Sequence, residues 1–479
     1  MMVVAIWLAL VSTAIGDTAL SAYHPQRILI LPRDASRGTA LEQFHTAQRH
    51  EVVRSFPAQG DVRVVKLADG ESVLAAVLRY RASGLVQFAE PDYVVSAAAT
   101  LPSDPRFQDG TQWWLNNYGQ NGGLPDADID APEAWDLVRN ASNVVVAIVD
   151  SGLRHTHEDL AGSLWKNPLD GTHGFNALTG NHDPWDDNGH GSHLAGIISA
   201  ATDNAKGIAG LAWRVQLMAC KFLDATGNGF NSDAVACIEF ARTNGAHVIN
   251  LSWGGSEFSA ILSNVIWSAR ADGILFTAAA GNNAQNTDAL PFYPASLALD
   301  NLVAVGASTR TDASWSFSNY GPTNVALFAP GAAIYSTGFT NDFHYASRNG
   351  TSMAAAVVAG ALALLLEHHP HELAPQLIER LLAAVDPNPA FAGKCRTGGR
   401  LNLRKAVDRP SITVTPEAWP IQLRITGFPG HRYLLTASTN FNAWTALRTN
   451  LADFNGEWIY EDNEATNTPL RFYQALPGP

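Results

Sequence analysis

Between residues 112 and 408, short apolar runs rich in β-branched residues alternate with longer stretches of helical character. Parallel strands need a crossover connection, which a helix supplies, so this alternation predicts a parallel sheet covered by helices on both faces. The runs expected as strands are 144–149, 215–222, 248–251, 274–278 and 302–305. The stretches expected as helices are 193–201, 233–244, 260–271 and 352–367. The sequence therefore indicates an α/β fold with a doubly wound parallel sheet.

The regions on either side of this sheet have different patterns. Residues 24–98 predict a small α+β unit, with strand-like runs at 27–31, 62–67 and 86–95 and helix-like runs at 38–50 and 71–81. A linker at 97–105, with small residues and two prolines, separates this unit from the sheet region. Residues 411–479 contain period-two runs and glycine-rich turns without a helical segment, so they predict a small all-β module.

The first sixteen residues form an uncharged apolar run that ends in small residues. This run is too short to span a bilayer and is typical of a secretory signal peptide. We therefore expect residues 1–16 to be a signal peptide and the protein to be secreted. The longest apolar stretch elsewhere, 353–366, has fourteen residues, a length that favours a buried core helix over a transmembrane span.

Charge and cysteine content narrow the possible partners. Lys plus Arg is 31 and Asp plus Glu is 44, which gives a net charge of −13. A chain this acidic, with no basic run, is a poor partner for nucleic acid or an anionic membrane surface. Three cysteines are too few for a disulfide scaffold, and no Cys-x-x-Cys pair is present to bind zinc. Cys220 and Cys237 could pair and leave Cys395 free, or all three could be buried thiols.

Three polar residues next to glycines stand out against this scaffold. Asp150 ends a strand-like run, whereas His190 and Ser352 each open a helix-like one. In a doubly wound sheet the ligand crevice lies beyond the carboxyl ends of the strands, so all three residues can meet there. An aspartate can orient a histidine, the histidine can take a proton from a serine, and the serine can then attack an acyl carbon.

The three residues lie in segments that resemble the catalytic signatures of the subtilisin-like serine peptidases (subtilases, peptidase family S8). These segments are AIVDSG, HGSHLAG and NGTSMA, and they follow the Asp, His, Ser order of that family. The resemblance extends over about residues 24–408. It implies a catalytic domain at 104–408 built on a seven-stranded parallel sheet. It also implies a serine-type endopeptidase that hydrolyses protein or peptide substrates through an acyl-enzyme, with Asp150, His190 and Ser352 as its triad.

The unit at 24–98 ends in VQFAEPDYVV (86–95) and resembles the inhibitor-like propeptide of the same family. The resemblance implies that this unit assists folding and blocks the active site with its extended tail, as the enzyme's own intramolecular inhibitor. We therefore expect a zymogen that processes itself in the linker. The module at 411–479 resembles small β modules of bacterial secreted proteins, and sorting, surface attachment, carbohydrate contact and stabilisation are all open as its role.

The resemblance also assigns residues that contact the substrate. Asn282, in FTAAAGNN (276–283), stands where the family has the side-chain donor of the oxyanion hole, which acts together with the N–H of the nucleophile. Phe292 stands at the floor of the pocket for the residue before the cleaved bond. Its bulk should make that pocket shallow and favour small or modest apolar residues. The two extended walls that pair with substrate backbone contain Gly227, Gly229, Ser252, Trp253 and Gly254.

Three further positions suggest a calcium site by the same resemblance. Asp159, Asn204 and Gln112 match positions of the family's strong calcium site, and carboxylate and amide oxygens suit Ca²⁺. We therefore expect a structural Ca²⁺ ion there. The clustered histidines do not indicate another metal site, because the sequence contains no His-Glu-x-x-His motif. We expect them to lie in the core or in solvated surface.

Two other functions are open. A non-catalytic binding or scaffold protein could use the same fold, although intact Asp150, His190, Asn282 and Ser352 weigh against this alternative. A lipase or esterase of the α/β-hydrolase kind would need Gly-x-Ser-x-Gly, but Ala354 stands where the final glycine is required. The leading hypothesis is therefore a secreted, self-processing serine endopeptidase.

Overall fold

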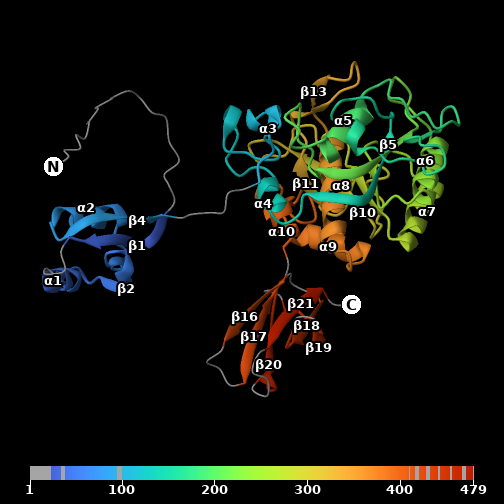
Figure 1. Ribbon diagram of the computed structural model, residues 1–479. Helices are drawn as coiled ribbons and strands as arrows, with labels where there is room; N and C mark the ends of the chain where they lie inside the picture. Colours follow the sequence, from blue (N-terminus) through green and yellow to red (C-terminus); the bar gives the residue numbers. More distant parts are fainter. Residues whose placement is uncertain are drawn as a thin grey trace, which may run out of the picture. The chain divides into compact units, whose positions relative to one another are not determined.

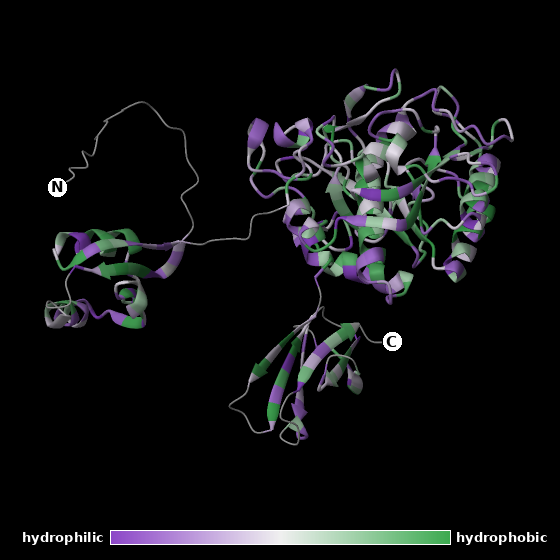
Figure 2. Cartoon of the chain, viewed as in Figure 1, coloured by the Kyte–Doolittle hydropathy of each residue, from purple (hydrophilic) through white to green (hydrophobic). Residues whose placement is uncertain are grey.

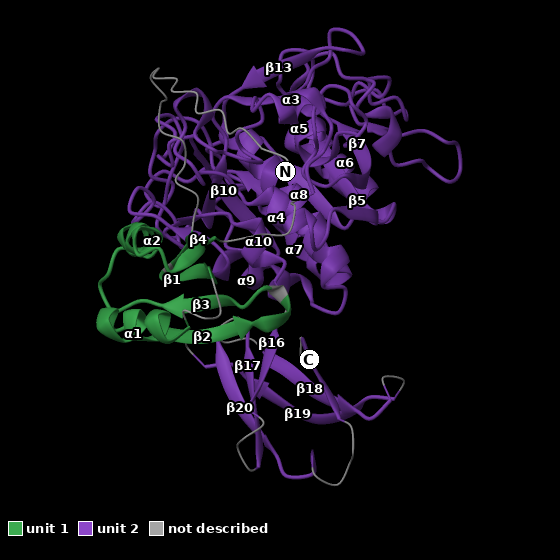
Figure 3. Ribbon diagram, turned by 60° about the vertical axis from the view of Figure 1, so that its left-hand side comes forward, with its two compact units in different colours: residues 1–98 green, residues 99–479 purple. Residues whose placement is uncertain are grey.

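The computed structural model describes residues 23–33, 38–93, 100–408, 410–415, 420–427, 432–440, 443–453, 456–465 and 471–477. The chain divides into two compact units, residues 1–98 and 99–479 (Figure 3). The expected signal peptide at 1–16 and residues 97–99 of the expected linker lie outside the described residues.

The N-terminal unit is a four-stranded antiparallel sheet with two helices packed into one core. The strand order is β2-β3-β1-β4, which confirms the predicted α+β unit. The sequence pattern does not predict β2, because its residues are mostly exposed and lack a period-two alternation. The elements are β1 (Tyr23–Pro32), α1 (Gly38–Gln48), β2 (Glu51–Phe56), β3 (Val62–Lys66), α2 (Val73–Ala82) and β4 (Val86–Tyr93).

The second unit contains the predicted doubly wound sheet, with strand order β14-β15-β11-β10-β9-β8-β5-β7-β6 (Figure 1). The seven strands from β5 to β11 that belong to this sheet pair in parallel, as expected, and the short β15 and β14 extend its edge. The strands are β5 (Asn140–Asp150), β6 (Gly174–Asn176), β7 (Arg214–Lys221), β8 (Val248–Leu251), β9 (Leu275–Ala279), β10 (Leu302–Ser308), β11 (Leu327–Pro330), β14 (Asp386–Pro387) and β15 (Gly399–Arg400). A separate antiparallel pair consists of β12 (Ile334–Thr337) and β13 (Tyr345–Arg348).

Helices cover both faces of this sheet, and the side chains of β5 show how. Val144, Val146 and Ile148 enter one hydrophobic core together with residues of α5 and α8. The alternate residues 145, 147 and 149 enter a second core with α6 and α7. The helices of the unit are α3 (Pro105–Gln108), α4 (Ala131–Trp135), α5 (His190–Ser199), α6 (Asn231–Thr243), α7 (Ala260–Ser268), α8 (Thr351–His368), α9 (Ala374–Ala383) and α10 (Leu403–Ala406). A strand buried on both faces therefore sends alternate side chains to opposite helical layers.

Helix α8 is the central helix of the unit and packs against five strands of the sheet. Every residue from Thr351 to Leu365 is buried. Among the described residues, α8 is the one helix long and apolar enough to cross a membrane by length and composition, and 83% of that window is buried inside the protein. Figure 2 shows hydrophobic residues along the interior strands and hydrophilic residues on the outer loops.

The C-terminal residues form the predicted all-β module from two antiparallel three-stranded sheets, with orders β16-β17-β20 and β19-β18-β21. The side chains of Leu423, Ile425, Tyr433, Leu435 and Trp458 form its core. The strands are β16 (Ser411–Thr415), β17 (Ile421–Thr426), β18 (Arg432–Ser438), β19 (Thr445–Leu451), β20 (Glu457–Asp462) and β21 (Phe472–Pro477).

The core of the N-terminal unit contains a hydrogen-bonded cluster of two histidines and a tyrosine. Nδ1 of His45 and Nδ1 of His50 lie 2.7 and 2.9 Å from the hydroxyl of Tyr80, and Nε2 of His50 lies 2.7 Å from Glu71. Because the carboxylate of Glu71 can only accept, the proton of a neutral His50 lies on Nε2, and Nδ1 of His50 accepts from the Tyr80 hydroxyl. The oxygen of Tyr80 then accepts from Nδ1–H of His45. Nε2 of His45 is buried without a partner among the described residues. The arrangement therefore suits two neutral imidazoles.

Burial is the largest influence on both histidines and lowers the pKa of each below its usual value. For His45, Glu42 opposes burial, whereas Arg63 and His50 add to it. For His50, Arg79 adds to the effect of burial. A protonated His45 would place a new N–H in the core without an acceptor, and a protonated His50 would direct a second donor at Tyr80.

We expect acid to destabilise the N-terminal unit. The unfolded histidines bind protons near pH 6.5 and the folded ones resist protonation, so the stability contribution is present above pH ~6.5 and is lost as pH falls. The measurement is amide-exchange protection of α2 in the full-length Ser352→Ala chain, compared at about pH 7.5 and about pH 5. His45→Gln and His50→Gln should each reduce the pH dependence. Equal protection at both values in the unsubstituted background would contradict the expectation.

Candidate active site

The carboxyl edge of the sheet brings Asp150, His190 and Ser352 within one region. Asp150 is the last residue of β5 and follows Val146 and Ile148 on the face that packs against α5 and α8. His190 is the first residue of α5, and Ser352 is the second residue of α8. Strand period and helix start therefore aim all three side chains at one place.

Asp150 and His190 form a direct hydrogen bond. Nδ1 of His190 lies 2.8 Å from Oδ1 of Asp150, and Asp150 is fully buried. Oδ1 also accepts from the backbone N–H of Ser151 at 2.8 Å. Because the carboxylate accepts from Nδ1, the neutral imidazole has its proton there and leaves Nε2 unprotonated. His190 can therefore take a proton at Nε2.

Opposing effects act on the pKa of His190. Burial lowers it, but the charge of Asp150 and the hydrogen bond to that carboxylate outweigh burial and raise the pKa above its usual value. Arg348 lowers the pKa and Asp186 raises it, both by a smaller amount. The carboxylate therefore stabilises an imidazolium at this position.

Ser352 is held by a reciprocal contact with Ser252. Oγ of Ser352 donates to the carbonyl of Ser252 at 3.0 Å, and Oγ of Ser252 donates to the carbonyl of Ser352 at 2.9 Å. Asn250 donates to Oγ of Ser252, and Thr277 donates to Asn250. The Ser352 hydroxyl thus donates to Ser252, and it must release this carbonyl before it can give its proton to a base.

Asn282 lies beside the N-terminus of α8. Its Oδ1 accepts from the backbone N–H of Thr351 at 3.0 Å and from the Thr351 hydroxyl at 2.9 Å. With the oxygen fixed in this way, the Nδ2 group is left to donate elsewhere. The backbone N–H of Ser352 lies in the first turn of α8, where helical N–H groups lack an intrahelical acceptor. These two donors can serve one oxyanion.

The loop that precedes His190 is organised by one buried carboxylate. Oδ1 of Asp186 accepts from the hydroxyl of Ser151 and from the backbone of Asn188 and Gly189, at 2.7–3.0 Å. Oδ2 accepts from both the backbone and the hydroxyl of Ser192. Asp186 thereby joins the turn after Asp150 to both sides of His190.

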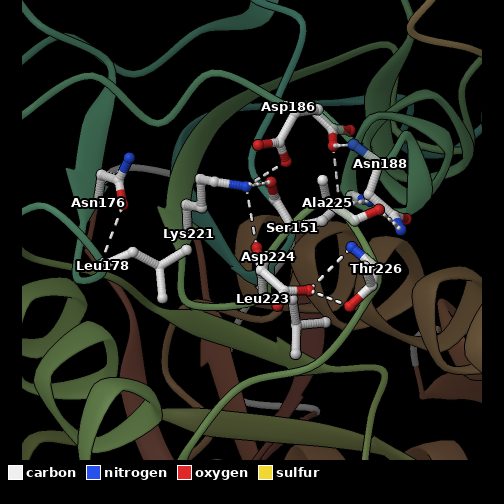
Figure 4. Close-up of polar contacts among 12 residues, drawn as sticks. Ser151, Asn176, Leu178, Asp186, Asn188, Lys221, Leu223, Asp224, Ala225 and Thr226 are labelled. Carbon is white, nitrogen blue, oxygen red and sulfur yellow. Dashed lines mark hydrogen bonds and ion pairs between the residues drawn. The ribbon is translucent and has the colours of Figure 1, made fainter.

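One expected substrate wall, residues 227–229, follows a turn that is held by Asp224 (Figure 4). The carboxylate of Asp224 accepts from the backbone and hydroxyl of Thr226 and from the backbone of Asn228. Gly227 donates its N–H to the carbonyl of Asp224 at 2.9 Å. A Cβ on Gly229 would lie 2.5 Å from the carbonyl of Phe222, so the fold itself requires glycine there.

The other expected wall, residues 252–254, packs against Phe292. Nε1 of Trp253 donates to the carbonyl of Val149 at 2.8 Å, and its ring packs on Phe222 with centroids 4.8 Å apart. A Cβ on Gly254 would lie 2.5 Å from the ring of Phe292. Phe292 therefore lies directly against this wall, and glycine at 254 makes room for its ring.

The three residues expected to bind calcium all meet the loop 202–210. Asp159 is fully buried, and it accepts from Asn204 at 2.9 Å, from Ile208 N–H at 3.0 Å and from the Tyr345 hydroxyl at 2.8 Å. Both polar ends of Gln112 bond the backbone of Ala209. The side chain of Gln112 therefore braces the loop, and its oxygen accepts one hydrogen bond there.

Asp104 is a residue that the sequence analysis missed. It is fully buried, and its Oδ2 accepts from the backbone of Asp203 at 2.7 Å. Its Oδ1 has no hydrogen-bond partner among the described residues. Burial, together with the nearby charge of Asp159, raises the pKa of Asp104 to about 6. This oxygen is the observation that makes the loop suitable for a cation. In the described part of the chain, no group of three His, Cys, Asp or Glu residues is close enough together to bind a metal ion. In the sequence, Asp104 is recognisable only as an aspartate directly before Pro105, and this pattern is equally typical of a helix N-cap.

The other histidines and the cysteines take structural positions. His157 and His193 are buried, and each bonds a backbone carbonyl, of His344 and Ala346. The cysteines are free and buried, which favours the second of the two alternatives left open for Cys220, Cys237 and Cys395.

Two family models match the chain. Residues 141–390 match the subtilase family of peptidases (Peptidase_S8), and residues 12–92 match the fervidolysin N-terminal prodomain. The second match begins at residue 12 and so overlaps the segment expected as a signal peptide.

Individual relatives give a consistent result. A thermophilic serine proteinase of Bacillus sp. (strain AK1) is 40% identical over 302 residues, which is 63% of this chain and 68% of the relative. Thermitase of Thermoactinomyces vulgaris is 39% identical over 264 residues, covering 55% of this chain and 85% of the relative. A solved structure of proteases from Pseudoalteromonas arctica is similar with a TM-score of 0.55 and 27% identity, covering 64% of this chain and 99% of that one.

We expect His190 to titrate above pH 6.5 and Asp150→Asn to lower that value. In the variant, burial still lowers the pKa, but the carboxylate charge that raises it is absent. Isotope-edited NMR of the imidazole in the Ser352→Ala background measures both values without autolysis. As a control, Asp224→Asn removes a carboxylate from the turn before the substrate wall and should leave the titration close to that of the parent. A parent pKa below 6.5 would show that the contact with Asp150 does not outweigh burial.

Proposed function

Because this chain belongs to the subtilase family of serine proteinases, we propose that it is a secreted endopeptidase that is made as a self-processing zymogen. The proposed organisation is a signal peptide at 1–16, a propeptide at 24–98, a catalytic domain at 104–408 and a β module at 411–479. The observation that carries the proposal is the 2.8 Å contact between Asp150 and His190 at the sheet edge where α8 presents Ser352.

In the proposed mechanism, Nε2 of His190 accepts the proton of Ser352 as Oγ attacks the scissile carbonyl carbon. Asp150 holds the imidazole by Nδ1 and stabilises the imidazolium that forms. Asn282 Nδ2 and the backbone N–H of Ser352 donate to the developing oxyanion. His190 then gives the proton to the leaving amine, and water releases the acyl group from Ser352 by the same steps in reverse.

The proposed substrate groove runs between the walls 227–229 and 252–254, where a peptide can add as an extended strand. Phe292 supports a shallow pocket, since its ring packs against Gly254 and fills the space beside that wall. The proposed preference is therefore for small or modest apolar residues before the cleaved bond. A peptide-library profile dominated by Arg or Lys at that position would contradict this preference.

We also propose a structural calcium ion held by Asp159, Asn204 and Gln112, as the sequence suggests, together with Asp104. Asp104 supports this proposal because its Oδ1 has no hydrogen-bond partner among the described residues and burial raises its pKa. Asp104 thereby adds a second carboxylate to the site expected from the sequence. Bound at this loop, a divalent cation would supply charge compensation to two buried carboxylates and no step of the hydrolysis.

The Ser352→Ala chain should accumulate as a precursor that retains the propeptide. Alanine has no oxygen to attack the carbonyl, and an oxyanion hole alone gives only slow hydrolysis. Expression in a host that lacks other extracellular proteases, followed by N-terminal sequencing, measures this. Ser142→Ala changes an exposed serine near the start of β5; it is the matched control and should be processed as the wild type is.

Two outcomes would separate the alternatives. Trimming of the Ser352→Ala precursor at the wild-type rate would show that another protease performs maturation. Failure of a fluorophosphonate probe to label Ser352 in the wild-type protein would favour the non-catalytic binding or scaffold function instead.

Calcium should raise the melting temperature of the Ser352→Ala protein, and chelation should lower it. A ligand that binds only the native state stabilises it by ~4 kcal/mol at a thousandfold excess over its Kd. Asp104→Asn should remove most of the calcium-induced shift. Asp109→Asn, a nearby exposed aspartate, should retain it. Equal melting temperatures with calcium and with chelator, in protein shown to be free of metal, would refute the site.

A further inference from the structure

Lys221 is a lysine whose side chain is only 4% exposed. It is the last residue of β7 and pairs in register with Asp150 at the end of β5. A buried ammonium is costly unless its protons are all accepted. Nζ of Lys221 lies 2.7 Å from the carbonyl of Ser151, 2.7 Å from Oδ1 of Asp187 and 2.9 Å from the carbonyl of Leu223. Three acceptors match the three ammonium protons.

The three acceptors belong to three different segments of the site (Figure 4). Ser151 follows Asp150, Asp187 lies in the loop before His190, and Leu223 begins the turn that leads into the wall 227–229. Figure 4 shows dashed lines from the ammonium of Lys221 to Ser151 and Leu223. One side chain therefore contacts the aspartate turn, the histidine loop and the turn that leads into the substrate wall.

The backbone next to Lys221 strengthens the same junction. The carbonyl of Asp150 accepts from the N–H groups of Phe222 and Leu223, at 2.9 and 3.2 Å. Asn188 donates its side-chain amide to the carbonyl of Ala225 at 3.1 Å, which joins the histidine loop to the turn before the wall. Residues 221–225 thus meet Asp150, Ser151 and the histidine loop within a few residues of His190.

We propose that Lys221 is a positioning residue that holds Asp150, His190 and the substrate wall in one arrangement. An apolar side chain of the same length would fill the space but leave two buried carbonyls, those of Ser151 and Leu223, without their donor. Asp187 is half exposed and can be solvated, so the cost of losing the ammonium falls on the two carbonyls next to the reacting groups. This inference rests on the proposed roles of Asp150, His190 and Ser352.

The test is Lys221→Met, which keeps the length and removes donors and charge. We expect kcat/KM to fall about 10- to 100-fold, mostly in kcat, because small displacements of reacting groups cost rate. The pKa of His190, which faces Asp150, Asp186 and Arg348, should rise by about 0.3–1 unit, because a nearby cation has been removed. Lys221→Arg, which restores charge and donors, should recover part of the activity.

Lys166→Met is the matched control, since this lysine is exposed and outside the site, and it should leave kcat and the His190 pKa unchanged. Asp187→Asn keeps the ammonium and both carbonyl bonds, so it gives a readout even where Lys221→Met fails to fold. Its expected effect is a smaller fall in kcat with a shift of the His190 pKa. If Lys221→Met folds and lowers only the melting temperature, or if Lys221→Arg folds without recovering activity, Lys221 is not a positioning residue.

The fluorophosphonate reaction separates this inference from the proposed function. A wild-type protein that does not label at Ser352 overturns the proposed function itself. A wild-type protein that labels, with Lys221→Met labelling at the same rate, overturns only the role of Lys221.

Discussion

From Val144 onward, strand β5 is buried on both faces, so each of these side chains must enter one of two cores. This constraint decides where Asp150 points: two residues after Ile148 and four after Val146, it faces the layer of α5 and α8. Both helices begin at the same sheet edge, so His190 and Ser352 arrive beside Asp150 by the packing of the core. The register of β7 places Lys221 on that edge as well. The geometry of the proposed site is thus a consequence of the parallel sheet.

Polar groups at this edge are paired in ways that join separate segments. Asp186 accepts from Ser151 on one side of His190 and from Ser192 on the other. The buried series from Thr277 through Asn250 to Ser252 ends on the carbonyl of Ser352. Removing one member of such a series leaves other buried groups without partners. The free-energy cost is therefore larger than the contribution of a single hydrogen bond.

The sequence was sufficient to predict the parallel sheet, the flanking α+β and all-β regions, and the positions of Asp150, His190 and Ser352, because periodicity and chain order are local properties. It could not show which oxygens are free. Gln112 and Asp104 are both polar residues before the sheet, and only the packing reveals that Gln112 bonds Ala209 at both polar ends while Asp104 Oδ1 has no partner in the part of the chain that the structure describes. Likewise, the sequence places Gly229 and Gly254 only in the expected substrate walls, whereas the packing shows that contacts with Phe222 and Phe292 already require glycine at both positions.

The contact between Asn282 and Thr351 has a consequence for how the proposed oxyanion hole is kept in shape. One proposed donor is a side chain from the loop after β9, and the other is a backbone N–H of α8, so the two come from different elements. Because Oδ1 of Asn282 is bonded twice to Thr351, the residue before Ser352, the Nδ2 group follows any movement of the start of α8. The nucleophile and both donors therefore move together, and their mutual geometry does not depend on the exact position of the helix in the core. Donors fixed in advance in this way need little reorganisation when negative charge develops on the carbonyl oxygen.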